Sequence, residues 1–142
     1  MNLPELKIGK LVAQVPIIQG GMAIRLSTAP LAAAVANEGG IGLIAASGMG
    51  LDELRKEIRM ARELTGGKGI IGINAMVAAR QFLDLITTAA EEGIDLIVAG
   101  AGFSRDIFAV GKKYGVEVVP IVSSARLAQT AEKLGASAVV VE

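Results

Sequence analysis

Six short apolar segments recur along this chain, and each of the first five is followed by a stretch of helical character. They begin near residues 15, 40, 69, 95, 117 and 137, a spacing of roughly 20 to 30 residues that is typical of a repeated structural unit. Parallel sheets fold from such alternation, because each intervening helix returns the chain to the starting edge of the sheet. The pattern therefore predicts an α/β fold, with one extra short strand near residues 7–11.

Several of these segments end in small or polar residues. Gly20 and Gly21 follow the first segment, Ser47 follows the second, and Asn74 lies near the end of the third. Glycine lets the backbone approach a ligand closely, because it has no Cβ atom. Since the C-terminal ends of parallel strands build the ligand site in folds of this kind, these residues are expected to line such a site.

The helical segments have recognisable ends. Ser27 or Thr28 is expected to cap the first helix, because a hydroxyl there can accept a hydrogen bond from a free backbone N–H. Asp52 is expected to open an amphipathic second helix whose charged side chains form a solvated face. Three further helices are expected over 79–92, over 104–114, and from Ser123 or Ser124 to residue 134.

Composition excludes several chemistries. The 142 residues suffice for one domain, and residues 1–142 are expected to form one. Basic and acidic residues balance at 14 each, which argues against a nucleic-acid partner. The absence of cysteine removes disulfides and thiolate chemistry, and the absence of histidine removes the commonest acid–base group and metal ligand. No metal site is expected.

Hydrophobic residues make up 52% of the chain, yet none of its uncharged runs is long enough to cross a membrane. The first residues lack the basic segment and long apolar core of a signal peptide. We therefore expect a cytoplasmic protein without membrane association.

Two folds fit the repeat. A doubly wound sheet of five or six strands matches the chain length, whereas a (β/α)8 barrel needs about 250 residues and eight strands. Six strands in 142 residues correspond to about three quarters of such a barrel. The chain lacks the GxGxxG and GxxxxGK[ST] fingerprints of nucleotide sites. The repeat pattern alone leaves both folds open.

An ordered series of sequence motifs gives a further indication of the fold and the function. The series is PIIQGGM at 16–22, LAAAVANEGGIG at 31–42, GIN at 72–74, GAG at 100–102, PIVSSA at 120–125 and AVVVE at 138–142. In this order the motifs resemble the nitronate monooxygenase family, formerly called 2-nitropropane dioxygenase, which includes the FMN-dependent enoyl-ACP reductase II enzymes. The resemblance covers nearly the whole chain.

The resemblance implies a TIM-type (β/α)8 barrel that holds FMN across its C-terminal strand ends, with about six strands and five helices in this chain. The family's glycine–methionine turn lies against the isoalloxazine ring, and its asparagine at the Asn74 position hydrogen-bonds the flavin or its ribityl chain. Ser47 is included by position only, and Glu142 matches a Gln or Glu that approaches the flavin from the sixth strand. The implied cofactor-binding residues are Gly20, Gly21, Met22, Ser47, Asn74 and Glu142.

Each assignment has a structural alternative. Asn74 is also placed to cap the third helix, Glu142 to be a solvated terminus, and Met22 to be a core residue. The Gly20–Gly21 pair taken alone is compatible with an ordinary tight turn.

The resemblance implies an FMN-dependent oxidoreductase that oxidises alkyl nitronates with O2. The alternative within the same family is an enoyl-ACP reductase, which also uses NAD(P)H and takes an enoyl thioester. Both substrates are small molecules, and the flavin would supply the redox chemistry that this histidine-free chain lacks. An IMP dehydrogenase relative is disfavoured because the chain has no catalytic cysteine.

The family pattern also continues past this sequence. In the family a Gly-Gly-His segment follows the sixth strand, and later loops hold the FMN phosphate, but residues 1–142 contain neither. The catalytic histidine is therefore expected beyond Glu142, and no catalytic residue is assigned in this chain. Six strands cannot close an eight-stranded barrel, so self-association or a missing C-terminal segment is expected. The alternative is a non-catalytic fragment that acts only by docking a complementary piece.

Overall fold

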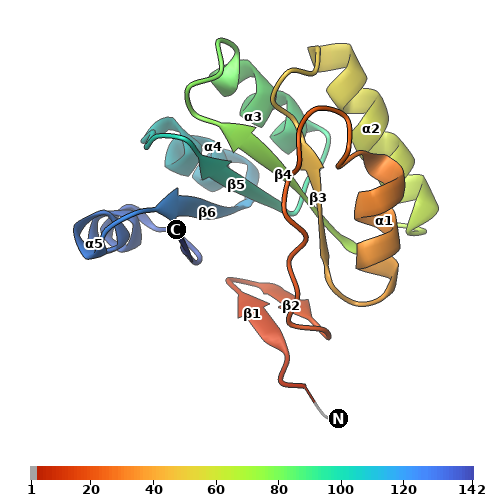
Figure 1. The fold of residues 1–142 in the computed structure, drawn as a ribbon, viewed down its shortest axis with the longest axis horizontal. Helices are drawn as coiled ribbons and strands as arrows, with labels where there is room; N and C mark the ends of the chain where they lie inside the picture. The colour runs from red at the N-terminus through yellow and green to blue at the C-terminus, as the bar shows by residue number, and fades with distance from the viewer. Residues whose placement is uncertain (1–2) are drawn as a thin grey trace.

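The computed structural model describes residues 3–142, in which an N-terminal hairpin precedes five helix–strand steps (Figure 1). The elements are β1 (Leu6–Ile8), β2 (Leu11–Ala13), α1 (Ala29–Asn37), β3 (Ile41–Ala45), α2 (Leu51–Leu64), β4 (Ile70–Met76), α3 (Phe82–Glu91), β5 (Leu96–Gly100), α4 (Asp106–Tyr114), β6 (Glu117–Val122), α5 (Ala125–Leu134) and β7 (Val140–Val141).

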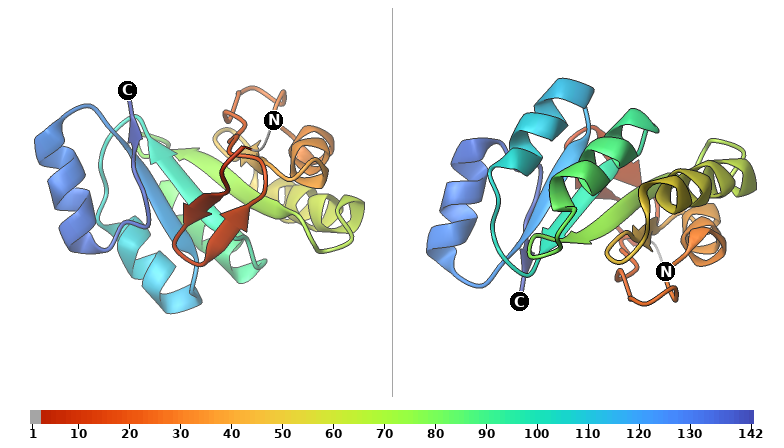
Figure 2. Two further views of the ribbon diagram at one scale, coloured as in Figure 1. Left: turned by 90° about the horizontal axis from the view of Figure 1, so that it is seen from below. Right: turned by 90° about the horizontal axis from the view of Figure 1, so that it is seen from above.

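The main sheet is parallel, and its strands lie in the same order as in the sequence, β3-β4-β5-β6-β7. A sixth segment runs beside β3, because the Ile41 N–H donates to the Ile17 carbonyl and the Gln19 N–H donates to the Ile41 carbonyl. A doubly wound sheet reverses its strand order at a switch point, and this sheet does not. The structure therefore confirms the barrel-type alternative, with the helices outside a curled sheet (Figure 2).

The alternation of side chains along the strands divides the core in two. Ile44, Ile73 and Ile97 face the helices and form the larger apolar cluster with them. Their neighbours Leu43 and Leu96 face the concave side of the sheet, in a second cluster. Burial on both faces explains why these strands are continuous apolar runs rather than alternating ones.

The N-terminal hairpin covers one end of the concave face. Ile8 and Ala13 are buried in the concave cluster, and the turn residue Lys10 donates its backbone N–H to Glu117, the first residue of β6. The hairpin thus lies at the N-terminal ends of the strands, below the sheet in Figure 1. The single strand expected near residues 7–11 is instead the two strands of this hairpin, which turn at Gly9 and Lys10.

The first helix is capped from a distance. Thr28 occupies the cap position, as expected, but its hydroxyl makes no capping hydrogen bond. Instead the Ala29 N–H donates to the Glu57 carboxylate of α2 at 2.6 Å. A carboxylate at a helix N-terminus also complements the helix dipole, so this contact stabilises α1 and ties it to α2.

The observed ends of several other helices and strands differ from the expected ones by a few residues. Helix α3 begins at Phe82 rather than at residue 79, because residues 77–81 form a turn. Ser124 caps α5 as expected, accepting from the Leu127 N–H at 3.3 Å. Strand β7 is shorter than expected, although the Ser137 and Glu142 N–H groups continue its pairing with β6.

The charged face of α2 is only partly solvated, which corrects the expectation for this helix. Arg55 and Arg59 both pair with Glu92 at the end of α3, at 3.0 and 2.7 Å, and Arg62 pairs with Asp95 at 2.9 Å. Hydrogen bonds from Arg59 and then Arg55 hold the pKa of Glu92 below its ordinary value. These charges therefore join neighbouring helices as well as facing water. Within residues 3–142 no helix has the length and apolarity needed to cross a membrane.

Candidate functional site

The turn at Gly20–Met22 follows the segment beside β3, at the C-terminal end of the strands. Neither glycine has a positive φ, so backbone conformation does not explain why glycine is needed here. At Gly21, the close approach of a neighbouring side chain explains the need for glycine. A Cβ atom built on Gly21 would lie 2.2 Å from the Asn74 Cβ and 2.7 Å from its Cγ, whereas one built on Gly20 would meet nothing within 4 Å. Gly21 thus packs its backbone directly on the Asn74 side chain.

Asn74 lies on the concave face of β4, paired in register with Ala45 of β3 and Val98 of β5. Its side-chain amide makes no hydrogen bond within the part of the chain that the structure describes. The alternative role as a cap of α3 is wrong, because the cap position of that helix is Gln81. An amide that is half-buried and unpaired can donate to a ligand and accept from one.

A cavity of about 210 Å³ opens on the concave face at this point. Gly20 and Asn74 lie at its polar side, and the remaining wall is mainly aliphatic. The lining residues are Ile18, Gln19, Gly20, Leu43, Asn74, Val98, Ile121 and Val140. Apolar walls with a few polar groups are typical of cofactor and substrate sites.

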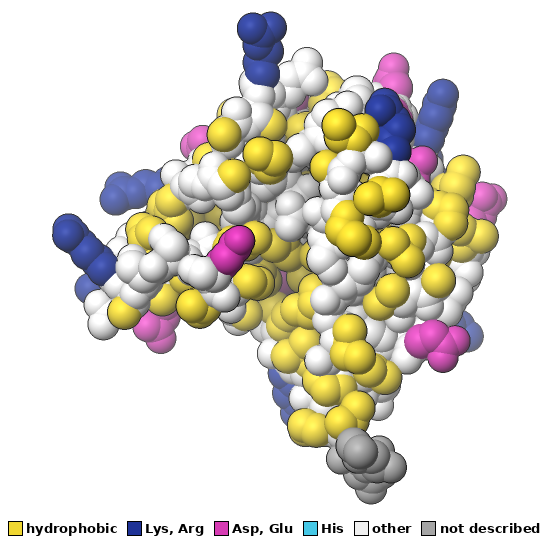
Figure 3. Space-filling model, viewed as in Figure 1, with side chains coloured by type: hydrophobic (Ala, Val, Ile, Leu, Met, Phe, Trp, Pro, Cys, Tyr) yellow, Lys and Arg dark blue, Asp and Glu magenta, His cyan; other side chains and the backbone are white. Residues whose placement is uncertain are grey.

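Met22 is 46% exposed, so it is not the core residue of the structural alternative. Figure 3 shows hydrophobic side chains over the loop before α1. Two residues of this loop, Ile24 and Leu26, are even more exposed than Met22. The loop is fastened to α2 by Arg25, whose guanidinium donates two hydrogen bonds to Glu53 and lowers the pKa of that carboxyl.

Ser47 lies apart from the 210 Å³ cavity. Its hydroxyl accepts a hydrogen bond from the Met76 N–H at 2.8 Å and so joins the loop after β3 to the end of β4. Glu142 lines a neighbouring cavity of about 290 Å³ with the loops that follow β5 and β6. Both cavities share Ile121, so Glu142 and Asn74 lie at the same end of the sheet.

Two site residues were missed by sequence reasoning. Ser27 is fully buried, and its hydroxyl bonds to the backbone of Gly20 and Met22. Gln19 also bonds to Ser27, and through its side-chain amide to the backbone of Leu43. The sequence held one indication of Gln19: it is a polar residue that follows the apolar run 15–18 and directly precedes the glycine pair.

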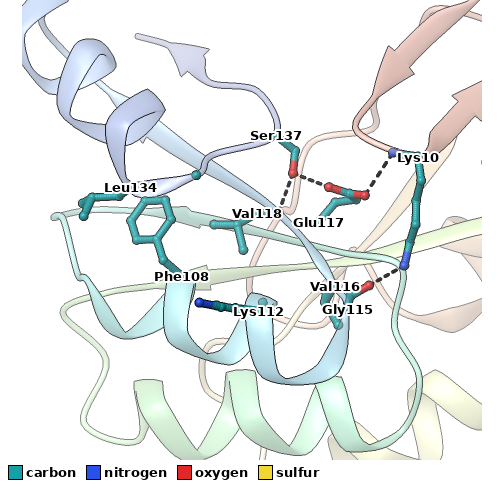
Figure 4. Close-up of a pocket in the computed structure, with 11 residues that line it drawn as sticks. Lys10, Phe108, Lys112, Gly115, Val116, Glu117, Val118, Leu134 and Ser137 are labelled. Atoms are coloured by element: carbon teal, nitrogen blue, oxygen red, sulfur yellow. Dashed lines mark hydrogen bonds between the residues drawn. The ribbon is translucent and has the colours of Figure 1, made fainter.

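A larger cavity of about 390 Å³ lies at the opposite end of the strands (Figure 4). Most of its polar groups are paired with one another. Lys10 donates to the Gly115 carbonyl, Glu117 accepts from the Lys10 N–H and from the Ser137 hydroxyl, and Ser137 accepts from the Val118 N–H. These hydrogen bonds fasten the hairpin to β6. The Lys112 side chain also lines the cavity and makes no hydrogen bond within residues 3–142. In residues 3–142 no cluster of three or more acidic side chains could hold a metal ion.

A parallel sheet in sequential order, with helices on its convex face and a ligand-sized cavity at its C-terminal ends, defines an α/β protein of the TIM-barrel class. The family described as nitronate monooxygenase matches residues 5–96. The chain belongs to this family, as its motifs indicated.

Solved structures agree on the fold. FabK from Thermotoga maritima is 36% identical, with a TM-score of 0.84 over 89% of this chain and 40% of its own. A nitroalkane oxidase from Streptomyces ansochromogenes is 23% identical, with a TM-score of 0.80 over 92% of this chain and 46% of its own. The second likeness supports the fold alone.

Curated relatives include a (3aS,4S,5R,7aS)-5-hydroxy-7a-methyl-1-oxo-octahydro-1H-indene-4-carboxyl-CoA dehydrogenase from Mycobacterium tuberculosis, 29% identical over 89% of this chain. A protein of the same name from Rhodococcus jostii is 29% identical over 91% of this chain. This chain spans 35% and 36% of the lengths of these two proteins.

Proposed function

We propose that this chain forms the ring side of an FMN site in an oxidoreductase. The observation that carries the proposal is the contact of the Gly21 backbone with Asn74, whose amide is unpaired, at the edge of an aliphatic cavity. A flat heteroaromatic ring needs a backbone that it can approach closely and an amide that can both donate and accept. The residues present fit that requirement.

The proposed roles follow from these positions. The backbone of Gly20, Gly21 and Met22 would lie against the ring, and the Asn74 amide would bond to its polar edge. Ser47 accepts a hydrogen bond from the Met76 N–H and keeps its own hydroxyl proton for a ligand. Glu142 approaches from the neighbouring cavity. When bound, FMN supplies the electron transfer, and the protein supplies position and hydrogen bonds.

Nitronate oxidation by O2 is the activity that we propose first. A nitronate is already deprotonated, so its oxidation requires little acid–base catalysis from a chain without histidine. Reduction of an enoyl thioester with NAD(P)H is the second candidate. It is favoured by the similarity to FabK, of the enoyl-ACP reductase branch, at 36% identity, and by the carboxyl-CoA name of the mycobacterial relative.

The experiment begins with the cofactor. The full chain is purified, its visible spectrum is recorded, and the ligand released by heat is identified by mass spectrometry. FMN is expected, and FAD is not, because the chain lacks a dinucleotide fingerprint. Recovery of FAD, or of no flavin after incubation with FMN, would overturn the proposal.

The loaded protein then distinguishes the two activities. Nitronate-dependent O2 consumption without NAD(P)H supports the first activity. NAD(P)H oxidation that depends on an added enoyl thioester supports the second and replaces the first.

A further inference from the structure

A small buried hydrogen-bond network lies directly behind the Gly20–Met22 turn. We propose that Ser27 and Gln19 are positioning residues, which fix this turn for the ligand that binds against it. The inference rests on the proposed function, because the ligand in question is the flavin ring. It adds two residues that contact the turn and hold its shape.

The Ser27 hydroxyl is at the centre of the network. It donates to the Gly20 carbonyl at 3.1 Å and accepts from the Met22 N–H at 2.9 Å and from the Gln19 amide at 2.7 Å. A serine hydroxyl has one proton and two lone pairs, so these three bonds use its full capacity. With its side chain fully buried, water cannot replace any of them. The hydroxyl therefore holds one arrangement of the turn.

Gln19 connects this arrangement to the sheet. Its side-chain oxygen accepts from the Leu43 N–H at 3.2 Å, and its nitrogen donates to the Leu43 carbonyl at 3.1 Å. The side-chain amide thus pairs with β3 as a backbone peptide unit would. Because β3 pairs in register with the strand that carries Asn74, the turn is held at a fixed position relative to Asn74.

The network also selects which backbone groups face a ligand. Ser27 bonds to both the Gly20 carbonyl and the Met22 N–H, and the Gln19 side-chain amide also donates to the Gly20 carbonyl at 2.8 Å. Within residues 3–142 the Gly20 and Gly21 N–H groups donate to no protein acceptor. The turn therefore offers two free N–H donors to a ligand, while its Gly20 carbonyl is already hydrogen-bonded. Free donors suit the edge of a flavin that carries its electron-rich carbonyl groups and ring nitrogens. Loss of the Ser27 hydroxyl would leave the Gly20 carbonyl with the Gln19 amide as its remaining donor, free the Met22 N–H and loosen the turn.

The test compares Ser27→Ala and Gln19→Met in the full chain with the parent protein. Ser137→Ala is the matched control, because its hydroxyl also bonds to backbone and to a side chain, but at the opposite end of the sheet. Ser27→Thr keeps the hydroxyl and tests for rescue. The readouts are the Kd for FMN, the visible circular dichroism of the bound flavin, and deuterium uptake by the backbone of residues 20–27 without flavin.

Ser27→Ala and Gln19→Met are each expected to weaken FMN binding about tenfold to a hundredfold, since each leaves a buried polar group unpaired. They should also change the visible circular dichroism and speed deuterium uptake in the turn, while Ser137→Ala changes none of these and Ser27→Thr restores most of the affinity. Parental affinity and dichroism in both variants would overturn the inference. If Ser27→Ala does not fold, Gln19→Met decides.

Failure of the proposed function is distinguishable from failure of this inference. A parent protein that binds no FMN refutes the proposed function. In that case deuterium uptake still tests the network, and unchanged uptake in both variants would refute the positioning role. If the parent binds FMN and the two variants bind it equally well, only the positioning role fails.

Discussion

Replacing Gly21 with alanine tests the close contact on which the site is built. The added Cβ would lie 2.2 Å from the Asn74 Cβ, whereas ordinary van der Waals contact begins at 3.4 Å. Asn74 or the turn must therefore move by more than 1 Å. Overpacking of this kind costs about 1–3 kcal/mol. We expect Gly21→Ala to lower the free energy of unfolding by that amount in the flavin-free protein.

Gly20→Ala is the matched control. Its Cβ would meet nothing within 4 Å, and Gly20 has no positive φ, so the free energy of unfolding should change by less than about 0.5 kcal/mol. Urea denaturation followed by far-ultraviolet circular dichroism measures both variants. Equal effects of the two substitutions would refute the close contact.

A double variant identifies the atom responsible. Asn74→Ala keeps the Cβ that collides with the new methyl group, whereas Asn74→Gly removes it. In the Gly21→Ala background, Asn74→Gly should therefore recover stability relative to Asn74→Ala, despite the usual cost of about 0.5–1 kcal/mol for glycine in a strand. No difference between the two double variants would contradict this reading.

Four further predictions concern the site, the fold and the assembly. Asn74→Leu should weaken FMN binding by about 1–3 kcal/mol in a fluorescence titration and leave the flavin-free protein nearly as stable, because the lost partner belongs to the ligand; unchanged affinity would contradict its role. Glu57→Ala should lower the free energy of unfolding in urea by about 0.5–2 kcal/mol, since the Ala29 N–H loses its acceptor; a smaller loss would show that water serves equally well. Because the pKa of Glu92 is lowered in the folded protein, its ionised carboxylate stabilises the fold above the ordinary carboxylate pKa of about 4.3, and this stabilisation should be lost as pH falls through the lower folded pKa. In that acidic range the urea midpoint of Glu92→Gln should depend less on pH than that of the parent protein, and the same pH dependence in both would refute the prediction. The isolated polypeptide of residues 1–142 should self-associate in analytical ultracentrifugation, because β7 is an edge strand and Val141 is 76% exposed; a monodisperse monomer with one FMN would contradict this.

Strands were predictable from the sequence because burial on both faces produces continuous apolar runs. The segments at Ile41–Ala45 and Leu96–Gly100 lie within a residue or two of their expected positions. The order of the strands in the sheet was not predictable from this pattern. A helix of the same length can connect two strands whether the sheet keeps the order of the sequence or reverses it. The motif series indicated the barrel class, and the observed order confirms it.

The parts of the site that follow strand ends were also predictable. Gly20 and Asn74 line one cavity, as expected for residues at the C-terminal ends of parallel strands, although their proposed contacts with FMN remain predictions. The supporting contacts were not predictable, because they join residues far apart in the chain. Gln19 bonds to Leu43, and the cap of α1 comes from Glu57 rather than from a local hydroxyl. The capping rule offered Ser27 or Thr28 as the cap of α1; Thr28 takes that position, and tertiary packing places Ser27 under the turn.

Nuclear magnetic resonance during an FMN titration tests the central claim most directly. Backbone N–H signals of Gly20 and Gly21 and the side-chain NH2 signals of Asn74 should shift together, with one dissociation constant. Gly66 and Gly67, in the turn between α2 and β4 at the far end of the sheet, serve as internal controls and should not shift. Shifts confined to other residues, or no shifts at saturating FMN, would contradict the account.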